Sequence, residues 1–303
     1  MFCEDDTAQR EIMLTIKKQK DQFFTAQRQA VMDSCSDPSI KRQLDLLSEK
    51  GASSWLTSLP LKEYGFLLNK QEFGDAIALR YNLTLSSLNR PKTCECGETF
   101  NINHCLICKK GGFVALRHDS LKNTIAKLLE QPCKDVKLIN ITGEQLNTGA
   151  NISDGARLDI SAIGFWTPLD RAFTDIRVLH PQAPSNRNKS LKQMYRSHEN
   201  EKKNAYNQRV IKVEKATFTP LVFSTTGGMG EECAAFLKHL AEKISMKTGQ
   251  RYCEVIAFIR RRIRFDLLKT CLISLRGYRG KASAKAAAVA DLDLNLRPQA
   301  VYN

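Results

Sequence analysis

The chain has 303 residues, enough for about two domains, and its hydrophobic content of 42% allows a sizeable buried core. No apolar run approaches the roughly 18 residues of a membrane-spanning helix, and the acidic start M-F-C-E-D-D does not resemble a secretory signal. Lys and Arg number 46 against 32 Asp and Glu, a net charge of +14 that favours a polyanionic partner. Without a membrane segment or amphipathic anchor, we expect nucleic acid; the alternative is a basic protein with no polyanionic partner.

The ten cysteines indicate a reducing compartment, where thiols stay free or bind metal. Six of them are scattered along the chain and are interpreted as packing residues: Cys3, Cys35, Cys133, Cys233, Cys253 and Cys271. The other four lie between residues 94 and 108, and this crowding needs a separate explanation.

Residues 7–50 are predicted to be helical, with a break and restart at Asp37, since the proline that follows it is tolerated in a first helical turn. A further helix is expected to begin at Asn69, whose side chain can cap it, with Glu72 three residues later. Residues 1–90 are therefore predicted to form a helical module without obvious chemistry of its own.

A cluster of cysteine and histidine follows, in the pattern C-x-C-x(7)-H-x(3)-C. Three thiolates and an imidazole suit the tetrahedral zinc ion. The expected zinc ligands are Cys94, Cys96, His104 and Cys108. The opening departs from the usual C-x-x-C, so Cys105 is an alternative ligand, and free cysteines are the alternative to a metal site. Residues 91–112 are predicted to be a zinc knuckle that folds on metal binding, because they are too few to form a core.

The pattern from residue 113 onward is that of an α/β domain, in the order helix, three strands, helix, strand. The first helix is expected to be capped by Asp119 or Ser120. The four strands are expected at residues 136–141, 157–164, 172–179 and 218–224. Two amphipathic helices should follow, the second interrupted by the R-R-R-I-R run at 260–264, which would form a basic stripe. We expect a core domain over 113–250, then a C-terminal basic helix and flexible tail over 251–303.

The helix between the third and fourth strands is strongly basic and should begin at Ser190. Residues 185–215 hold nine Lys and Arg against three Glu. This helix is expected to contact nucleic acid through Lys192, Arg196, Lys203 and Arg209. The alternative is a solvated basic helix with no partner.

Two aspartates, Asp159 and Asp175, lie in otherwise apolar strand segments. A buried carboxylate is costly unless it is paired or binds a cation, and two on neighbouring strands can converge on one Mg²⁺. Lys202 on the following helix could orient or deprotonate an attacking water, or neutralise a phosphate. Tyr206 is one turn further on and could hydrogen-bond a phosphate or the lysine. The pattern predicts metal-dependent hydrolysis of a phosphodiester.

The motifs come in a fixed order: R-L-D, then fifteen residues, D-I-R, and then K-x-x-x-Y on a basic helix. This order resembles the restriction-like endonuclease of early-branching non-LTR retrotransposons. That family has a PD-(D/E)xK-type core whose catalytic lysine lies on the helix after the strand, preceded by a CCHC zinc knuckle. An R-H-N-like element opens its nuclease domain, and Arg117, His118 and Asp119 resemble it. The resemblance covers about residues 90–225, and residues 45–90 resemble the family's linker from the reverse transcriptase to the knuckle.

The resemblance implies an αβββαβ restriction-like core with Asp159 and Asp175 as magnesium ligands and Lys202 and Tyr206 as further catalytic residues. It also gives supporting roles to Arg117, His118 and Arg177. From spacing alone, His118 would be only a structural histidine.

The chain departs from the family pattern at several positions. Leu158 replaces the proline before the first aspartate, and Asp119 replaces the asparagine of R-H-N. Arg177 stands where a standard (D/E)-x-K lysine would be. Lys192 and Lys203 compete with Lys202 for the catalytic role, and only Lys202 is four residues from Tyr206.

The resulting hypothesis is a Mg²⁺-dependent endonuclease that nicks target DNA for target-primed reverse transcription. The reverse-transcriptase motif Y/F-x-D-D is absent from the chain. Expected partners are target DNA, element RNA and the reverse-transcriptase part of the same polyprotein, with no membrane; the protein would be made in the cytoplasm and act in the nucleus. The alternatives are a non-catalytic zinc-containing nucleic-acid-binding remnant and a scaffold that contacts the polymerase through residues 1–90.

Overall fold

The computed structural model describes residues 3–83, 93–139, 158–277 and 279. The chain divides into two compact units, residues 1–45 and 46–303, and each is described by itself. The sequence also predicts a short basic hinge at 88–92 and a polar loop at 143–155; both lie outside the described residues, as does the predicted C-terminal tail beyond residue 279. Within the described residues, no helix is both long and apolar enough to cross a membrane.

The first unit contains helix α1 (Cys3–Ser34) and the start of α2 (Pro38–Ser48). The predicted break at Asp37 is confirmed, and its carboxylate accepts a hydrogen bond from the backbone N–H of Ser39 (2.7 Å). An ion pair between Arg28 and Asp45 (2.6 Å) ties the two helices together.

The second unit is built on a mixed four-stranded sheet in the order β1-β2-β3-β4. The strands are β1 (Lys134–Leu138), β2 (Ile160–Ile163), β3 (Arg171–Leu179) and β4 (Thr217–Ser224). The first three pair antiparallel, and β3 pairs parallel with β4. The α/β class and the order of elements are therefore confirmed.

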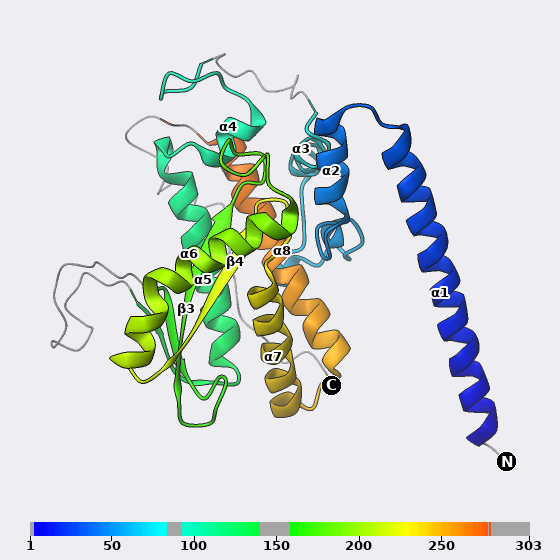
Figure 1. The fold of residues 1–303 in the computed structure, drawn as a ribbon, viewed down its shortest axis with the longest axis vertical. Coiled ribbons are helices and arrows are strands. Elements are labelled where there is room, and N and C mark those ends of the chain that lie inside the picture. Colours follow the sequence, from blue (N-terminus) through cyan, green and yellow to red (C-terminus); the bar gives the residue numbers. More distant parts are fainter. Residues whose placement is uncertain (1–2, 84–92, 140–157, 278, 280–303) are drawn as a thin grey trace. The chain divides into compact units, whose positions relative to one another are not determined.

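Helices cover both faces of this sheet (Figure 1). The larger core lies against α5 (Phe113–Glu130), α7 (Glu231–Thr248) and α8 (Tyr252–Arg276). Helix α6 (Leu191–Lys212) crosses the other face over β3 and β4, where two smaller apolar clusters form. Alternate residues of β3 therefore face opposite layers: Ile176 joins the large core, whereas Phe173 and Leu179 pack on the α6 side.

Local sequence chemistry explains where several helices begin. Asn69 forms a capping box with Glu72 at the start of α3 (Lys70–Tyr81), and Ser190 forms one with Gln193 at the start of α6. Helix α5 begins earlier than predicted, at Phe113, because Gly112 adopts a left-handed conformation before it. Ser120 is therefore inside the helix, where its hydroxyl donates to Asp266 (2.5 Å).

Residues 46–81 pack on α8, which is one continuous helix with no interruption at 260–264. The predicted basic stripe is wrong for two of its four arginines, because Arg262 and Arg264 are buried. Arg262 donates to the carbonyl of Tyr64 (2.7 Å) and Arg264 to that of Ala52 (3.1 Å). Backbone carbonyls of residues 46–81 thus accept one hydrogen bond from each of these two buried guanidinium groups, while Nε and Nη2 of Arg262 are buried without a partner among the described residues.

Candidate functional site

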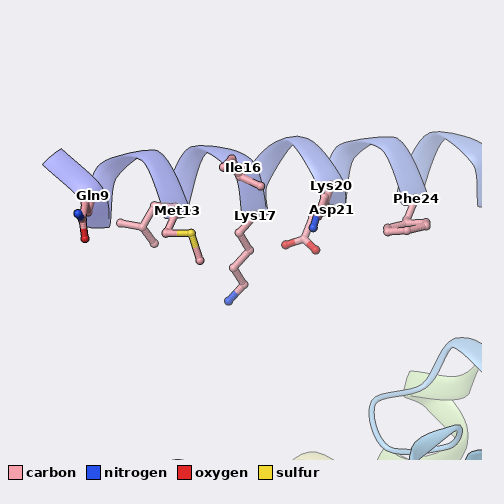
Figure 2. A pocket seen from close by; sticks show the side chains of 8 residues that line it. Gln9, Met13, Ile16, Lys17, Lys20, Asp21 and Phe24 are labelled. Atoms are coloured by element: carbon pink, nitrogen blue, oxygen red, sulfur yellow. The ribbon is translucent and has the colours of Figure 1, made fainter. Parts of the chain in front are cut away.

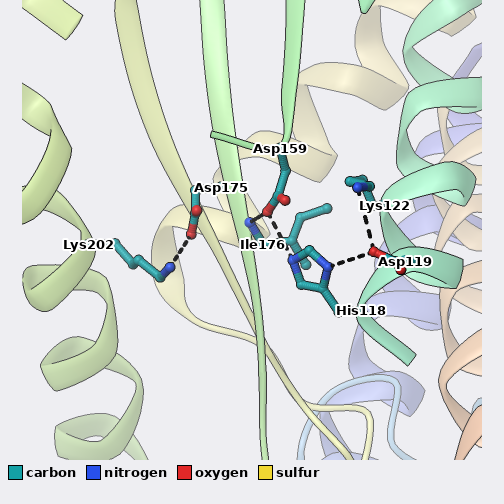
Figure 3. A network of polar contacts seen from close by, with 7 residues as sticks. All are labelled: His118, Asp119, Lys122, Asp159, Asp175, Ile176 and Lys202. Carbon is teal, nitrogen blue, oxygen red and sulfur yellow. Dashed lines mark hydrogen bonds and ion pairs between the residues drawn. The ribbon is translucent and has the colours of Figure 1, made fainter. Parts of the chain in front are cut away.

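Asp159 and Asp175 lie on neighbouring segments of the chain where β2 pairs with β3. Asp159 immediately precedes β2; its backbone N–H donates to the carbonyl of Thr174 (3.0 Å), and its Oδ2 accepts the N–H of Ile176 (2.6 Å). Both contacts fall on the residues that flank Asp175. Figure 3 shows the two carboxylates near each other, with Asp159 bonded to Ile176 and His118 and with Asp175 paired to Lys202. They are 8% and 3% exposed, so both are buried acids, as predicted.

Lys202 of α6 reaches across to β3 and forms an ion pair with Asp175. Its Nζ lies 2.6 Å from Oδ2 of Asp175, and the lysine side chain is 19% exposed (Figure 3). The same ammonium lies over the ring of Tyr206, 5.4 Å from its centre, and this ring packs edge-on against Phe218. The structure thus brings three of the four predicted catalytic residues into contact, with Asp159 beside them.

His118 completes this group from the opposite side, on α5. Its Nε2 lies 3.1 Å from Oδ2 of Asp159, and its Nδ1 lies 3.3 Å from Oδ1 of Asp119 (Figure 3). Both ring nitrogens face carboxylate oxygens, an arrangement that suits the doubly protonated imidazolium. Asp119 also pairs with Lys122 (3.5 Å). Spacing along the chain carried no signal for this contact, because His118 and Asp159 are 41 residues apart.

Burial and charge shift the titration of two of these groups. Burial raises the pKa of Asp175 to about 6, while the Lys202 ammonium opposes the shift and the negative charge of Asp159 adds to it. The hydrogen bond to Asp159 raises the pKa of His118 above its usual value, against the effect of burial. The site therefore combines an acid that is reluctant to ionise with an imidazole that favours its cationic form.

The two supporting arginines occupy different places. Arg177 lies two residues after Asp175 and pairs with Glu201 of α6 (2.7 Å), next to Lys202. Arg117 is buried and does not contact either aspartate; it donates to the carbonyl of Leu106 (3.0 Å) and to Ser274 (2.9 Å). Glu201 also faces His198 (3.5 Å), three residues earlier. Glu201 is not among the residues predicted from the sequence, although its place beside Lys202 on a basic helix was a usable signal.

The four expected zinc ligands converge on one point. The ligand atoms of Cys94, Cys96, His104 and Cys108 all lie within 4.8 Å of one another, and they can hold a zinc ion. The sulfur of Cys108 is 3.8 Å from that of Cys94 and 3.7 Å from that of Cys96. A tetrahedral ion with Zn–S bonds of about 2.3 Å requires sulfur separations of about 3.8 Å, so the spacing fits. Cys105 is fully buried outside this group, which resolves the ligand ambiguity.

Local structure explains how these ligands come together. The turn after Cys94 closes with Gly97 at φ +93° and with hydrogen bonds from Cys94 to Glu98 and from Gly97 to Cys94 (both 2.8 Å). Helix α4 (Ile102–Ile107), capped by Asn101, carries His104, and Cys108 follows directly after its last residue. Short hydrogen-bonded segments thus present the ligands from two sides.

The knuckle is attached to the rest of the second unit through polar contacts. Asn103, beside His104, contacts Nε2 of His180 (3.0 Å), whose Nδ1 contacts Thr225 (2.8 Å). Burial lowers the pKa of His180 to about 3, so this histidine is a neutral structural link. Arg117 adds a second link through Leu106.

The four basic residues expected to bind nucleic acid differ in their surroundings. Lys203 pairs with Glu232 of α7 (2.5 Å), and Lys192 lies 3.5 Å from Glu231 in an exposed pair. Arg196 is exposed and has no hydrogen bond or ion pair within the described ranges. Arg209 is partly buried. Arg196 is therefore the best placed of the four to meet a phosphate.

An open groove runs along one side of α1 in the first unit (Figure 2). It is lined by Gln9, Met13, Leu14, Ile16, Lys17, Lys20, Asp21 and Phe24. None of these is a predicted site residue, so the groove does not bear on the aspartate site.

A scan against protein-family models found no match, and a search of curated proteins also found none.

Proposed function

We propose that this chain is the metal-dependent DNA endonuclease part of a non-LTR retrotransposon polyprotein, with a PD-(D/E)xK-type core that nicks target DNA to prime reverse transcription. The observation that carries the proposal is the contact of Lys202 with Asp175 beside the Asp159–His118 pair. These residues come from separate elements and were singled out by one ordered set of motifs.

The donor set suits Mg²⁺. Oδ2 of Asp159 takes the contacts with His118 and Ile176, whereas Oδ2 of Asp175 is in the ion pair with Lys202 but is buried without a hydrogen bond among the described residues. Mg²⁺ is commonly held by one or two carboxylates together with water and substrate phosphate, so two aspartates are a sufficient protein contribution. A bound Mg²⁺ would activate water and offset phosphate charge.

The chain's own groups would serve the phosphodiester on either side of this position. The Lys202 ammonium offsets the charge that develops on the phosphate or orients the attacking water, and Asp175 holds the ammonium in place. The ring of Tyr206 limits where the lysine can move. His118 fixes the Asp159 carboxylate through Nε2.

The remaining parts would bind the polyanions. The zinc knuckle and the exposed side of α6, with Arg196, are proposed to contact DNA or element RNA, consistent with the net charge of +14. The polymerase partner would be the reverse transcriptase of the same polyprotein, with the nucleus as the place of action.

The experiment is nicking of supercoiled plasmid in the presence of Mg²⁺ by the wild type and Asp175→Ala. We expect the substitution to lower the nicking rate by about 10²-fold or more. Asp170→Ala is the matched control, because Asp170 lies in the loop between β2 and β3 and its carboxylate contacts only Thr167 (2.5 Å) among the described residues. Equal rates for Asp175→Ala and the wild type would refute the assigned site.

Lysine substitutions separate the competing candidates. Lys202→Ala should reduce nicking as strongly as Asp175→Ala, whereas Lys203→Ala, whose ammonium pairs with Glu232, should leave most of the activity. DNA binding without cleavage by the wild type would instead favour the non-catalytic nucleic-acid-binding remnant.

A further inference from the structure

A buried carboxylate joins the helix that carries Lys202 to the neighbouring helix α7. Glu199 lies one turn before Lys202 on α6 and is 6% exposed. Its Oε1 accepts the backbone N–H of Glu232 in the first turn of α7 (3.1 Å). This glutamate takes no part in the function proposed above.

Helix α7 has no cap from its own sequence. Its N-cap residue is Gly230, which offers no side-chain acceptor. The free N–H groups and the positive end of the helix dipole favour a carboxylate at this place. Glu199 supplies it from another helix, 33 residues earlier in the chain.

Gly230 is also what lets Glu199 come so close. A Cβ at this position would overlap Oε1 of Glu199. The backbone φ of Gly230 is −70°, which any residue can adopt. Glycine is required here because the carboxylate of Glu199 approaches so closely. The missing side chain of Gly230 at the start of α7 therefore leaves the space that the carboxylate of Glu199 on α6 occupies.

This contact determines how α6 is rotated about its axis. Residues three and four apart on a helix share a face, so Glu199, Lys202 and Lys203 point to the same side. Glu199 and Lys203 both bind Glu232, through its backbone and its side chain, while Lys202 between them meets Asp175. A rotation of α6 would break all three contacts together.

We propose that Glu199 is a positioning residue that fixes α6 on the N-terminus of α7 and so holds Lys202 against Asp175. The inference is drawn from the contacts of Glu199, Lys202 and Lys203. The effect of Glu199 on catalysis rests on the proposed endonuclease function.

Three substitutions test the cap. Glu199→Gln keeps a side-chain oxygen that can accept the Glu232 N–H. Glu199→Leu removes the acceptor, and Gly230→Ala pushes the carboxylate away without deleting it. Ile244→Val on α7 is the stability control, since it removes one buried methyl group far from the cap, at a cost of about 1 kcal/mol.

The first measurement is the rate of reductive methylation of Lys202 in the folded protein, followed by mass spectrometry. We expect Glu199→Leu and Gly230→Ala to raise this rate about fivefold, equivalent to about 1 kcal/mol, the net worth of one hydrogen bond. The rate at exposed Lys212 should not change. Glu199→Gln and Ile244→Val should resemble the wild type. An unchanged rate in Glu199→Leu and Gly230→Ala, or an equal rise in Ile244→Val, would overturn the proposal.

The second measurement is single-turnover nicking of DNA. Glu199→Leu and Gly230→Ala should slow the nicking step with little change in DNA affinity, and Glu199→Gln should restore the rate. A wild type that does not nick DNA contradicts the proposed function alone, because the methylation rates still decide whether Glu199 positions Lys202.

Discussion

Asp175 is the residue at which stability and the proposed chemistry oppose each other. It is 3% exposed, and Lys202 is its one ion-pair partner within the described chain. Burial raises its pKa from 3.8 to about 6, so the folded protein binds this proton more tightly than the unfolded chain does. The unfolding free energy should therefore fall as the pH rises from about 4 to about 6 and stay level above that. The same ionised carboxylate would attract a divalent cation.

Asp175→Asn should therefore change how the unfolding free energy depends on pH. Relative to the wild type, the variant should gain about 1–3 kcal/mol in unfolding free energy between about pH 4 and pH 7, because it has no charge to bury. Loss of the ion pair with Lys202 lowers the unfolding free energy of the variant, and this loss is a separate contribution to the difference from the wild type. Urea titrations across this range measure the difference, with the exposed-hairpin change Asp170→Asn as the control. Parallel pH profiles for Asp175→Asn and the wild type would contradict the prediction.

At the level of elements, the predicted zinc knuckle is the part that we expect to depend most on a ligand, because its four Cys and His ligand atoms can hold a zinc ion. The segment from residue 93 to 110 forms a bridge between Thr93 and Thr99, one turn and the six-residue helix α4. A helix of this length is not stable alone, so the binding of zinc by the sulfur and nitrogen ligands would supply the folding free energy of the segment. Its links to the rest of the unit run through Arg117 and His180.

Removing zinc with a chelator should therefore unfold residues 93–110 while the sheet remains. Backbone chemical shifts measure this, and shifts that stay unchanged in the segment after metal removal would refute the zinc site. Cys105→Ala should keep one bound zinc per chain, whereas Cys96→Ala should lose it, because Cys96 belongs to the ligand group and Cys105 does not.

For the whole molecule, the net charge of +14 matters more than any single lysine. Lys and Arg that neutralise phosphates release counterions, so the affinity for DNA should fall steeply with salt. Part of the positive charge on α6 is already compensated within the protein, by Glu232 and Glu231. Some of the basic side chains of α6 are thus paired with glutamates of the protein itself, and others are free to contact nucleic acid.

Two substitutions on α6 separate these contributions. Arg196→Ala should reduce the salt dependence of DNA affinity by about one phosphate contact, whereas Lys203→Ala should change it less, since Lys203 is paired with Glu232. Binding isotherms at several salt concentrations give the slopes. An affinity independent of salt would exclude the expected nucleic-acid partner.

Local chemistry made several parts of this protein predictable from sequence. Asn69 with Glu72 and Ser190 with Gln193 form capping boxes, so the starts of α3 and α6 follow from neighbouring residues. The apolar segment at 172–179 was predicted as a buried strand, and the structure confirms it as β3. The four expected zinc ligands lie within fifteen residues, and their spacing predicted the group that the structure brings together, although the spacing left Cys105 as an alternative ligand.

Tertiary structure alone decided the contacts between distant segments. His118 meets Asp159, Glu199 caps α7, and Arg264 is buried against the carbonyl of Ala52. The sequence by itself determined the elements and the residues with chemical potential, because caps and periodic patterns act over a few positions. Which of those residues meet depended on how the helices pack on the sheet, since the partners of a buried charge come from any part of the chain.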